Sequence, residues 1–533
     1  MPVTVIVFMA NSSWQINKIK NITMKRILNY SLFVFGLVFM GSCDKGLEDL
    51  NVNKTSAIAV DPSFQLNNAV INLANTGATL IWDIGIVQQI ISPNGGVLAG
   101  ANFNQDNRSS AQLWPAFYQN VIKNTHDVKV RTMDDPARSN LYNMARIVEA
   151  YGYMVLTDTY GSIPYTEGGA GYSDQIFFPA YDAQQDIYQK LLQEFAEASA
   201  ALNPAGRVEN ADVLYAGNID QWKKFGYSLL LRAGMRLSKV DATKAQSTVQ
   251  AAFAAGVITE NEDNALMRLD ANYTNAIGNT LNSTEAANFY LTKPFVDQLK
   301  NTDDPRLSAI AVRYVGATSG PGQTTDIASS SPGVQIGMPM GKDNGTVVAA
   351  AAADGLASFY DYSQVDRRRM AKNSSPTFFV TAAQTLLLLA EARLRGWITT
   401  GTEQEYYDAG VSAHMNQMAS YDPGAAVPVA AIQPYLDANP YSSANGLDQI
   451  NTQYWIASFL NGPEAFANFR RSGFPALTPN PYGQPNNPDV PNGTFIRRLT
   501  YPTTELSSNT DNVNAAIAVQ GPDKLDTKLW WDK

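Results

Sequence analysis

The side chains that most often carry catalysis or metal binding are scarce in this sequence. Its 533 residues include two histidines, His126 and His414, and one cysteine, Cys43, all far apart. A zinc site built from His and Cys is therefore excluded, because it needs about four such ligands close together. The HExxH and GxSxG patterns are absent as well. We predict no catalytic residue, no metal site and no cofactor.

Two segments bear a partial likeness to ion-binding loops, and both depart from the pattern at required positions. In 337–343 the glycine spacing is one residue short of a phosphate loop, and Asp343 replaces the Ser or Thr. In 270–281, Asn275 stands where a calcium loop requires glycine, and Leu281 stands where it requires Glu. Neither segment is predicted to bind an ion. Paired carboxylates for glycoside hydrolysis stay open, since no pattern singles out a pair among the 48 acidic residues.

The positive signal is aromatic. The chain has 25 tyrosines and 8 tryptophans, and many lie in segments without helical periodicity, interleaved with Asn, Gln, Ser and Thr. Aromatic faces stack on sugar rings or peptide side chains, while amides supply hydrogen bonds. The alternative for each residue is that it packs a loop onto the core. The predicted ligand contacts are Trp82, Asn102, Tyr273, Asn279, Phe289, Tyr290, Tyr360 and Tyr362.

The amino-terminal region predicts export and lipidation. Lys25 and Arg26 precede a largely apolar run, 27–40, which ends at Gly41, Ser42 and Cys43. This is a signal peptide in outline, and the run is too short to span a bilayer. Its end resembles the bacterial lipobox, so we predict that Cys43 is acylated. The alternative is an ordinary signal peptide followed by a free cysteine.

The predicted division of the chain has three parts. Residues 1–23 lie upstream of Met24, whose Lys-Arg pair already supplies the charged start of a signal peptide, so Met24 is the predicted start. The alternative is a functional leader extension. Residues 24–42 are the signal peptide, and 43–533 are predicted to form one domain.

The mature chain is acidic. Removing 1–42 takes away four basic residues and leaves 35 basic against 48 acidic ones, a net charge of −13. Nucleic acid and anionic lipid are therefore not the predicted partners, because both need clustered Lys and Arg. The short arginine clusters at 367–369, 470–471 and 497–498 are interpreted as ion-pairing or carbonyl-capping groups.

Helical periodicity dominates the mature chain. Helices are predicted after Pro136, after Asp182 as N-cap with Gln185 in capping-box position, and after Asp220. Residues 377–395 are apolar on most sides and predict a buried helix. Long irregular segments at 316–345 and 474–492 interrupt the helices. The pattern favours one helical body that carries long loops.

Several motifs, taken in order, resemble those of one family. The clearest are Tyr-Gly-Ser-Ile-Pro-Tyr at 160–165 and the Trp-Lys-Lys-Phe helix at 222–236. The others lie at 44–51, 304–307, 390–397, 469–475 and 530–532. In this order they are similar to the SusD/RagB-type nutrient-binding lipoproteins of Bacteroidetes.

The resemblance implies a mainly α fold, in which tetratricopeptide-like helix pairs form a right-handed superhelical scaffold. Long loops and minor β elements would form the ligand face. It also implies a noncatalytic protein, anchored through Cys43 in the outer membrane, that captures an oligosaccharide or peptide for a SusC-like TonB-dependent transporter. The shared motifs are interpreted as structural, with Arg232, Arg236 and Glu391 paired in the core and Tyr160 and Pro164 shaping a turn. A surface α-helical glycosidase and a purely structural helical repeat are the alternatives.

Overall fold

The computed structural model describes residues 60–95, 102, 106–171, 173–283, 286–483, 490 and 493–533. Residues 61–533 form one compact unit. Cys43, the signal peptide and the start at Met24 lie outside the described residues. Within the described part, no helix is long and apolar enough to cross a membrane.

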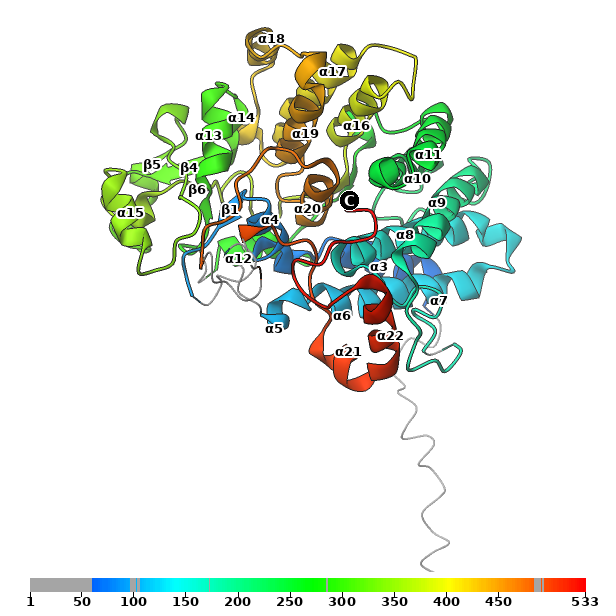
Figure 1. Cartoon of the computed structure of the whole chain (residues 1–533). Coiled ribbons are helices and arrows are strands. Elements are labelled where there is room, and N and C mark those ends of the chain that lie inside the picture. The colour runs from blue at the N-terminus through cyan, green and yellow to red at the C-terminus, as the bar shows by residue number, and fades with distance from the viewer. Residues whose placement is uncertain are drawn as a thin grey trace, which may run out of the picture. The chain divides into compact units, whose positions relative to one another are not determined.

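The longer helices pack side by side in pairs, and in most pairs the two helices follow one another in the chain (Figure 1). This arrangement confirms the predicted mainly α fold built from helix pairs. The longer packed pairs are α3 Pro62–Leu73 with α7 Lys123–Thr132, α8 Ser139–Tyr160 with α9 Gln184–Ala201, α10 Ile219–Arg236 with α11 Ala242–Ala255, α16 Ala382–Leu394 with α17 Glu403–Gln417, and α19 Gly446–Ala457 with α20 Gly462–Ser472.

Shorter helices lie within and between these pairs and after the last of them. They are α4 Asp83–Ile86, α5 Asn107–Ser110, α6 Leu113–Phe117, α12 Ala276–Leu281, α13 Lys293–Asn301, α14 Arg306–Ile310, α15 Val347–Ala353, α18 Val429–Ala438, α21 Thr503–Ser508 and α22 Thr510–Gln520. The pair α21 and α22 lies beside α6 in Figure 1. This end of the molecule holds a cavity of about 600 Å³.

The helix starts correct two of the sequence predictions. The Asp182 side chain does not cap α9, because its carboxylate accepts hydrogen bonds from the backbone of Tyr165 and Thr166 instead. Helix α10 begins before Asp220, because the Asn218 side chain caps its first turn. Asp135, by contrast, caps the turn that leads into α8, as the sequence indicated.

The predicted buried helix at 377–395 is divided in the structure. Its first residues form strand β7 Thr377–Val380, which pairs antiparallel with β2 Ala265–Met267. Two β-branched residues and two phenylalanines favour this extended conformation. The helix proper, α16, starts after Thr381, which forms a capping box with Gln384.

The remaining β structure is minor, as predicted. Strands β1 Ile90–Ile91 and β3 Tyr290–Leu291 pair antiparallel. A three-stranded sheet has the order β5 Ala328–Ser329, β4 Ala311–Tyr314, β6 Gln364–Val365. These strands hold the loop-rich middle of the chain beside the helices.

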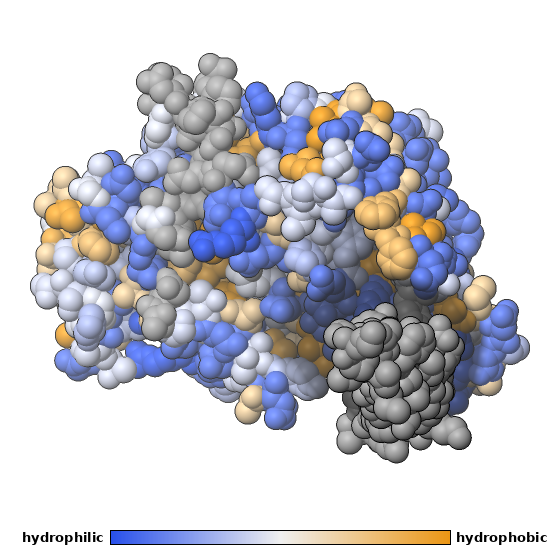
Figure 2. Space-filling view, turned by 90° about the horizontal axis from the view of Figure 1, so that it is seen from below, coloured by the Kyte–Doolittle hydropathy of each residue, from blue (hydrophilic) through white to orange (hydrophobic). Residues whose placement is uncertain are grey.

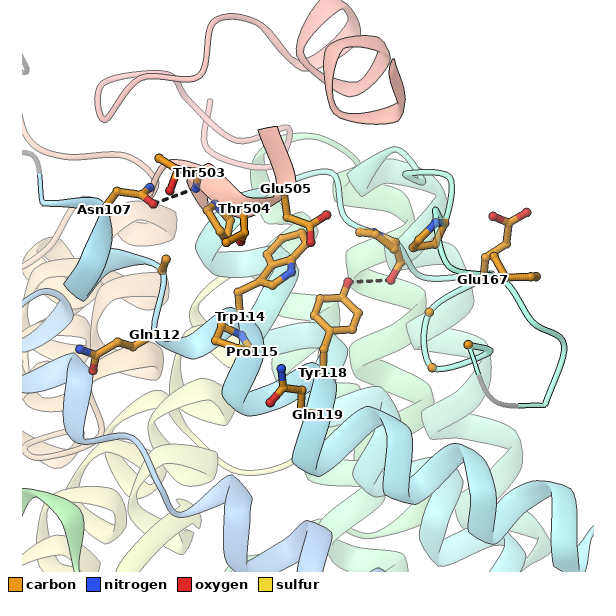
Figure 3. Close-up of a pocket in the computed structure, with 18 of the residues that line it drawn as sticks. Asn107, Gln112, Trp114, Pro115, Tyr118, Gln119, Glu167, Thr503, Thr504 and Glu505 are labelled. Atoms are coloured by element: carbon orange, nitrogen blue, oxygen red, sulfur yellow. Dashed lines mark hydrogen bonds between the residues drawn. The ribbon is translucent and has the colours of Figure 1, made fainter. Parts of the chain in front are cut away.

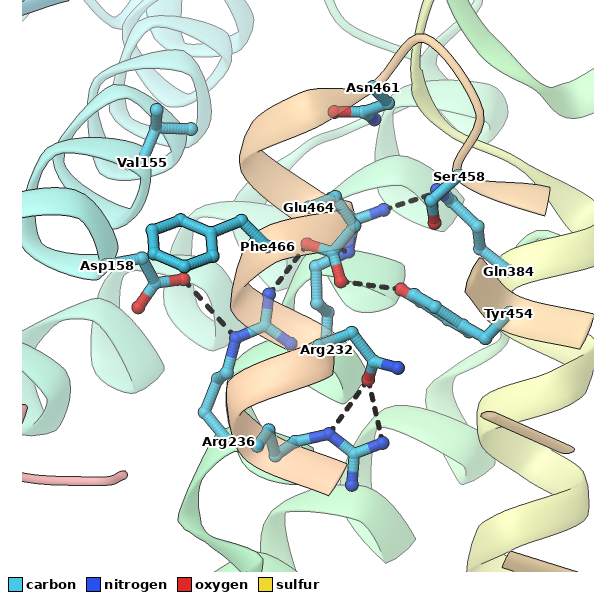
Figure 4. Close-up of polar contacts among 12 residues, drawn as sticks. Val155, Asp158, Arg232, Arg236, Gln384, Tyr454, Ser458, Asn461, Glu464 and Phe466 are labelled. Atoms are coloured by element: carbon cyan, nitrogen blue, oxygen red, sulfur yellow. Dashed lines mark hydrogen bonds and ion pairs between the residues drawn. The ribbon is translucent and has the colours of Figure 1, made fainter. Parts of the chain in front are cut away.

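A buried ionic network joins the helices (Figure 4). Arg232 and Arg236 of α10 both contact the carboxylate of Glu464 on α20, at 3.4 and 2.7 Å. Tyr454 of α19 donates to the other oxygen of this carboxylate, and Arg236 also reaches Asp158 of α8. Burial alone would raise the pKa of Glu464, but the two guanidinium groups hold it below its ordinary value. The prediction that these arginines pair in the core is confirmed.

The other predicted core charges pair in the same way. The Glu391 carboxylate accepts hydrogen bonds from the two terminal guanidinium nitrogens of Arg471, at 2.8 and 2.7 Å. Arg470 and Arg498 are also fully buried, and each donates to a backbone carbonyl. The interpretation of the arginine clusters at 470–471 and 497–498 as structural therefore agrees with the structure.

Candidate functional site

Most of the aromatic residues predicted as ligand contacts are buried. The Trp82 side chain is 1% exposed and donates its indole N–H to Ser109. Burial favours the alternative that these side chains hold loops on the core, and their ligand role stays an untested prediction. The buried aromatic residues are Trp82, Phe289, Tyr290 and Tyr362, and the predicted contact Asn102 is buried as well.

The other predicted contacts remain accessible. Tyr273 is 53% exposed, Asn279 is exposed, and Tyr360 is partly exposed. Tyr360 stacks on Phe359 with ring centroids 4.2 Å apart. No ring contact joins Tyr360 to Tyr273 within the described residues. The ligand role of these three residues stays a prediction.

A cavity that the sequence analysis did not predict lies between α5, α6, α21 and the loop 164–179 (Figure 3). Its volume is about 600 Å³, within the range of small-molecule sites. We call it the Trp114 pocket. Its principal side chains come from Asn107, Arg108, Gln112, Trp114, Pro115, Tyr118, Gln119, Glu167, Ile176, Pro179, Thr503, Thr504 and Glu505.

The local fold turns these side chains toward one space. Helix α6 runs directly into a π-helical turn, Tyr118–Ile122, before α7 begins. Such turns insert a residue and change which side chains face a given side. Helix α8 ends at Tyr160 because Gly161 adopts a φ of 88°. The turn that follows brings Pro164 to the pocket, where its carbonyl accepts from the Tyr118 hydroxyl at 2.7 Å.

Aromatic rings form a rigid wall. The Trp114 indole stacks on Tyr181 with centroids 6.0 Å apart and planes at 25°, and it meets Tyr160 edge to face at 5.2 Å. Only 6% of Trp114 is exposed, so a small part of the indole lines the pocket. Tyr118 and Pro115 are more open. The wall therefore offers an apolar surface that does not rearrange easily.

The polar groups fall into two kinds. Gln112 and Gln119 are exposed, and neither side-chain amide bonds to another described residue. The Asn107 side chain, by contrast, is used internally, because it donates to the Tyr501 carbonyl and accepts from the Thr503 backbone. The two glutamines are therefore the amides available to a ligand.

The two carboxylates of the pocket already have structural partners. Glu505 accepts from the Tyr181 hydroxyl at 2.9 Å, and Glu167 accepts from the Ala180 backbone at 2.7 Å. Burial, with the Glu505 charge, raises the pKa of Tyr181 well above its ordinary value, so this phenol stays protonated and donates. The arrangement can bind a neutral ligand that has an apolar face and several hydrogen-bonding groups.

The histidines contribute no reactive group to this site. His414 is buried against Arg306, and burial, followed by the Arg306 charge, lowers its pKa well below the ordinary value. His126 bonds to Ser173. Across the part of the chain that the structure describes, no three His, Cys, Asp or Glu side chains gather as metal ligands would.

Comparison with known proteins identifies the fold. Residues 53–502 match the model of a SusD-like family described as "Starch-binding associating with outer membrane". A chitin-binding protein of known structure is 29% identical over 89% of this chain and 100% of its own, with a TM-score of 0.76. A search among curated proteins finds no match.

Two further structures share the fold. A SusD homologue from Bacteroides uniformis is 24% identical over 88% of this chain and 99% of its own, with a TM-score of 0.71. A chitin-binding SusD homologue from Flavobacterium johnsoniae is 23% identical over 89% and 97%, also with a TM-score of 0.71. At this identity the likeness concerns the fold alone.

Proposed function

The chain belongs to the SusD-like family of starch-binding proteins associated with the outer membrane, and we propose that it captures oligosaccharides at the Trp114 pocket and delivers them to a SusC-like TonB-dependent transporter. The family binds glycans without catalysis. The α-helical glycosidase considered from the sequence is therefore not retained. The proposal has three separable parts: the ligand, the pocket that holds it, and the partner that receives it.

The observation that carries the proposal is that a rigid aromatic wall lies beside side-chain amides that bond to no other described residue. A pyranose ring has apolar C–H faces and a rim of hydroxyl groups. The exposed part of Trp114 and the ring of Tyr118 can pack against the C–H faces. The amides of Gln112 and Gln119 can bond to the hydroxyl groups. The cavity holds no buried cluster of one charge, which favours a neutral ligand over an anionic one.

The first ligand to test is a chitin-type oligosaccharide, a chain of β-1,4-linked N-acetylglucosamine. The support is the relative named as a chitin-binding protein, at 29% identity, and the chemistry of the two glutamines. An acetamido group donates through its N–H and accepts through its carbonyl, as a glutamine amide does. A starch-type oligosaccharide is the second, because the family description names starch.

Calorimetric titration of the mature protein tests the ligand and the pocket together. We expect chitohexaose or maltohexaose to bind saturably and Trp114→Ala to weaken binding. Because Trp114 is almost buried, this variant also loses stability, so the exposed Gln112→Ala and Gln119→Ala variants serve beside it. Saturable binding of peptides with no glycan binding would contradict the proposal. Full glycan affinity in all three variants would show that the glycan binds outside the Trp114 pocket.

The anchor and the partner are tested in the cell. We expect the wild-type protein to fractionate with the outer membrane and to co-purify with a large TonB-dependent barrel. Cys43→Ala removes the predicted acylation site and should release a folded protein of unchanged glycan affinity. A Cys43→Ala protein that still fractionates with the membrane would contradict the lipid anchor. A wild-type protein that purifies alone under mild detergent would contradict the transporter complex.

A further inference from the structure

A second cavity, of about 340 Å³, lies between α9, the start of α11 and the carboxyl-terminal residues. We propose that this cavity, the Trp530 groove, is a second binding site for a neutral oligosaccharide, separate from the Trp114 pocket. The inference rests on the proposed glycan function and adds a second site to it. The two cavities share no lining residue.

The two adjacent tryptophans near the end of the chain have different environments. Trp531 is fully buried, and its indole N–H donates to Asp158 at 3.0 Å. Trp530 is partly exposed and lines the groove. Its backbone N–H donates to the Gln184 side chain at 2.9 Å, and its ring packs on Tyr188 with centroids 6.2 Å apart. Trp531 is therefore a core residue, whereas Trp530 is fixed in position with part of its indole exposed to solvent.

Polar side chains flank this indole on two sides. Gln185 and Gln189 lie one turn apart on α9 and are both exposed. Neither amide has a hydrogen-bond partner in the described residues, and the same holds for the indole N–H of Trp530. Asp241 and Lys244 face the groove from the first turn of α11, and both are exposed. Four side chains with donors or acceptors thus line the same cavity as the Trp530 indole.

The floor of the groove is apolar. Leu192 and Leu237 are buried beneath it, beside the ring of Tyr188. The single positive charge of Lys244 is matched by the negative charge of Asp241, so the groove does not select an anion or a cation. An apolar floor with a polar rim and no net charge suits a pyranose ring, which has the same division between its faces and its edge.

Two sites on one chain would change how the protein holds a polymer. Once one site has bound a long glycan, a second site on the same protein meets a neighbouring stretch at a high effective concentration. We therefore expect the groove to matter more for an insoluble or long polysaccharide than for a short oligosaccharide. The Trp114 pocket alone would bind both with similar affinity per site.

Titration calorimetry of the mature Cys43→Ala protein with chitohexaose and with maltohexaose tests the groove. We expect two binding events per chain for the preferred sugar, and Trp530→Ala to remove one of them. Gln189→Ala and Lys244→Ala change exposed residues and should weaken the same event without lowering the melting temperature. Gln193→Ala, on the same helix but outside the groove, is the matched control.

Retention on the insoluble polysaccharide is the second measurement. Trp530→Ala should lower it by about tenfold or more, because avidity from a second site is lost. If the wild type instead showed one binding event that the groove variants left unchanged, that result would overturn the groove as a second glycan site, while the glycan function of the protein would stand. If the groove variants no longer co-purified with the transporter but still bound two sugars per chain, the groove would be a protein-docking surface and the inference would be overturned. No binding of either sugar would overturn the glycan function and the groove together.

Discussion

The buried ionic network and the Trp114 pocket use polar side chains for opposite purposes. In the network, Arg232, Arg236 and Glu464 are sealed from water, and the carboxylate is bonded on both oxygens. In the pocket, Gln112 and Gln119 are exposed and have no described protein partner. Polar groups that the protein satisfies itself maintain the fold, whereas polar groups left to solvent are available to a ligand.

The two regions also differ in their relation to the sequence motifs. Arg232, Arg236, Arg471 and Trp531 all lie in the motifs that indicated the family, and all are buried in pairs or hydrogen bonds. The pocket takes mainly Pro164 from those motifs. In these two regions the motifs specify how the helices pack, and the Trp114 pocket is lined mainly by residues outside them.

Glu464→Ala should have the largest effect. It leaves Arg232 and Arg236 buried without the carboxylate that both contact, which costs about 3–5 kcal/mol of folding free energy. Chemical denaturation measures this loss. The control is Glu194→Ala, which removes a more exposed partner of Arg146 and should cost about 0.2–1 kcal/mol. Equal losses in the two variants would show that the network does not stabilise the scaffold.

Trp82→Ala should also act on stability rather than on binding. The side chain is 1% exposed and bonded to Ser109, so its removal leaves a cavity that costs about 3–5 kcal/mol. The exposed Tyr273→Ala is the matched aromatic control and should change the melting temperature little. If Trp82→Ala weakened glycan binding while the melting temperature stayed constant, Trp82 would be a ligand contact after all.

The sequence predicts the scaffold well because its signals are local. The apolar spacing after Pro136 indicates α8, and charges on apolar helical faces indicate Arg232 and Glu391 as core ion pairs. Strand β7 was missed because a run of apolar residues at 377–380 suits a buried helix as well as a strand. Periodicity alone does not separate the two.

The pocket could not be predicted in the same way. Its walls come from 107–119, 164–179 and 502–505, and nothing local indicates that these segments meet. Loop aromatics were a poor guide, because a buried loop also needs large apolar side chains, as Trp82 and Tyr362 demonstrate. The signal that was present is the run of Trp114, Pro115, Tyr118 and Gln119 in one short helical stretch.

Asp83 provides a contrast inside the scaffold, because its carboxylate is buried without a hydrogen-bond partner among the described residues. Burial raises its pKa from 3.8 to about 7, although the Arg470 charge opposes this. The folded protein then keeps a proton that the unfolded chain releases, so stability falls as the pH rises from about 4 to about 7. The loss amounts to at most roughly 4 kcal/mol.

Asp83→Asn should remove this pH dependence. Thermal unfolding of the wild type and the variant between about pH 4 and pH 8 measures it, and the two melting curves should converge at the acid end. Asp127→Asn, a change of a more exposed carboxylate on α7, is the control and should leave the slope as it is. A slope that persists in Asp83→Asn would mean that other buried groups carry the titration.

Gln112→Ala and Gln119→Ala should have the smallest effect on the fold and a selective effect on binding. Each removes an exposed amide, so the melting temperature should not change. Each should weaken glycan binding by about fivefold, the equivalent of one hydrogen bond of about 1 kcal/mol. Calorimetry measures the affinity, with Gln193→Ala as control, since that amide bonds to Glu197 outside the pocket. Lower stability with full affinity would assign these glutamines to the scaffold and remove the distinction between the two regions.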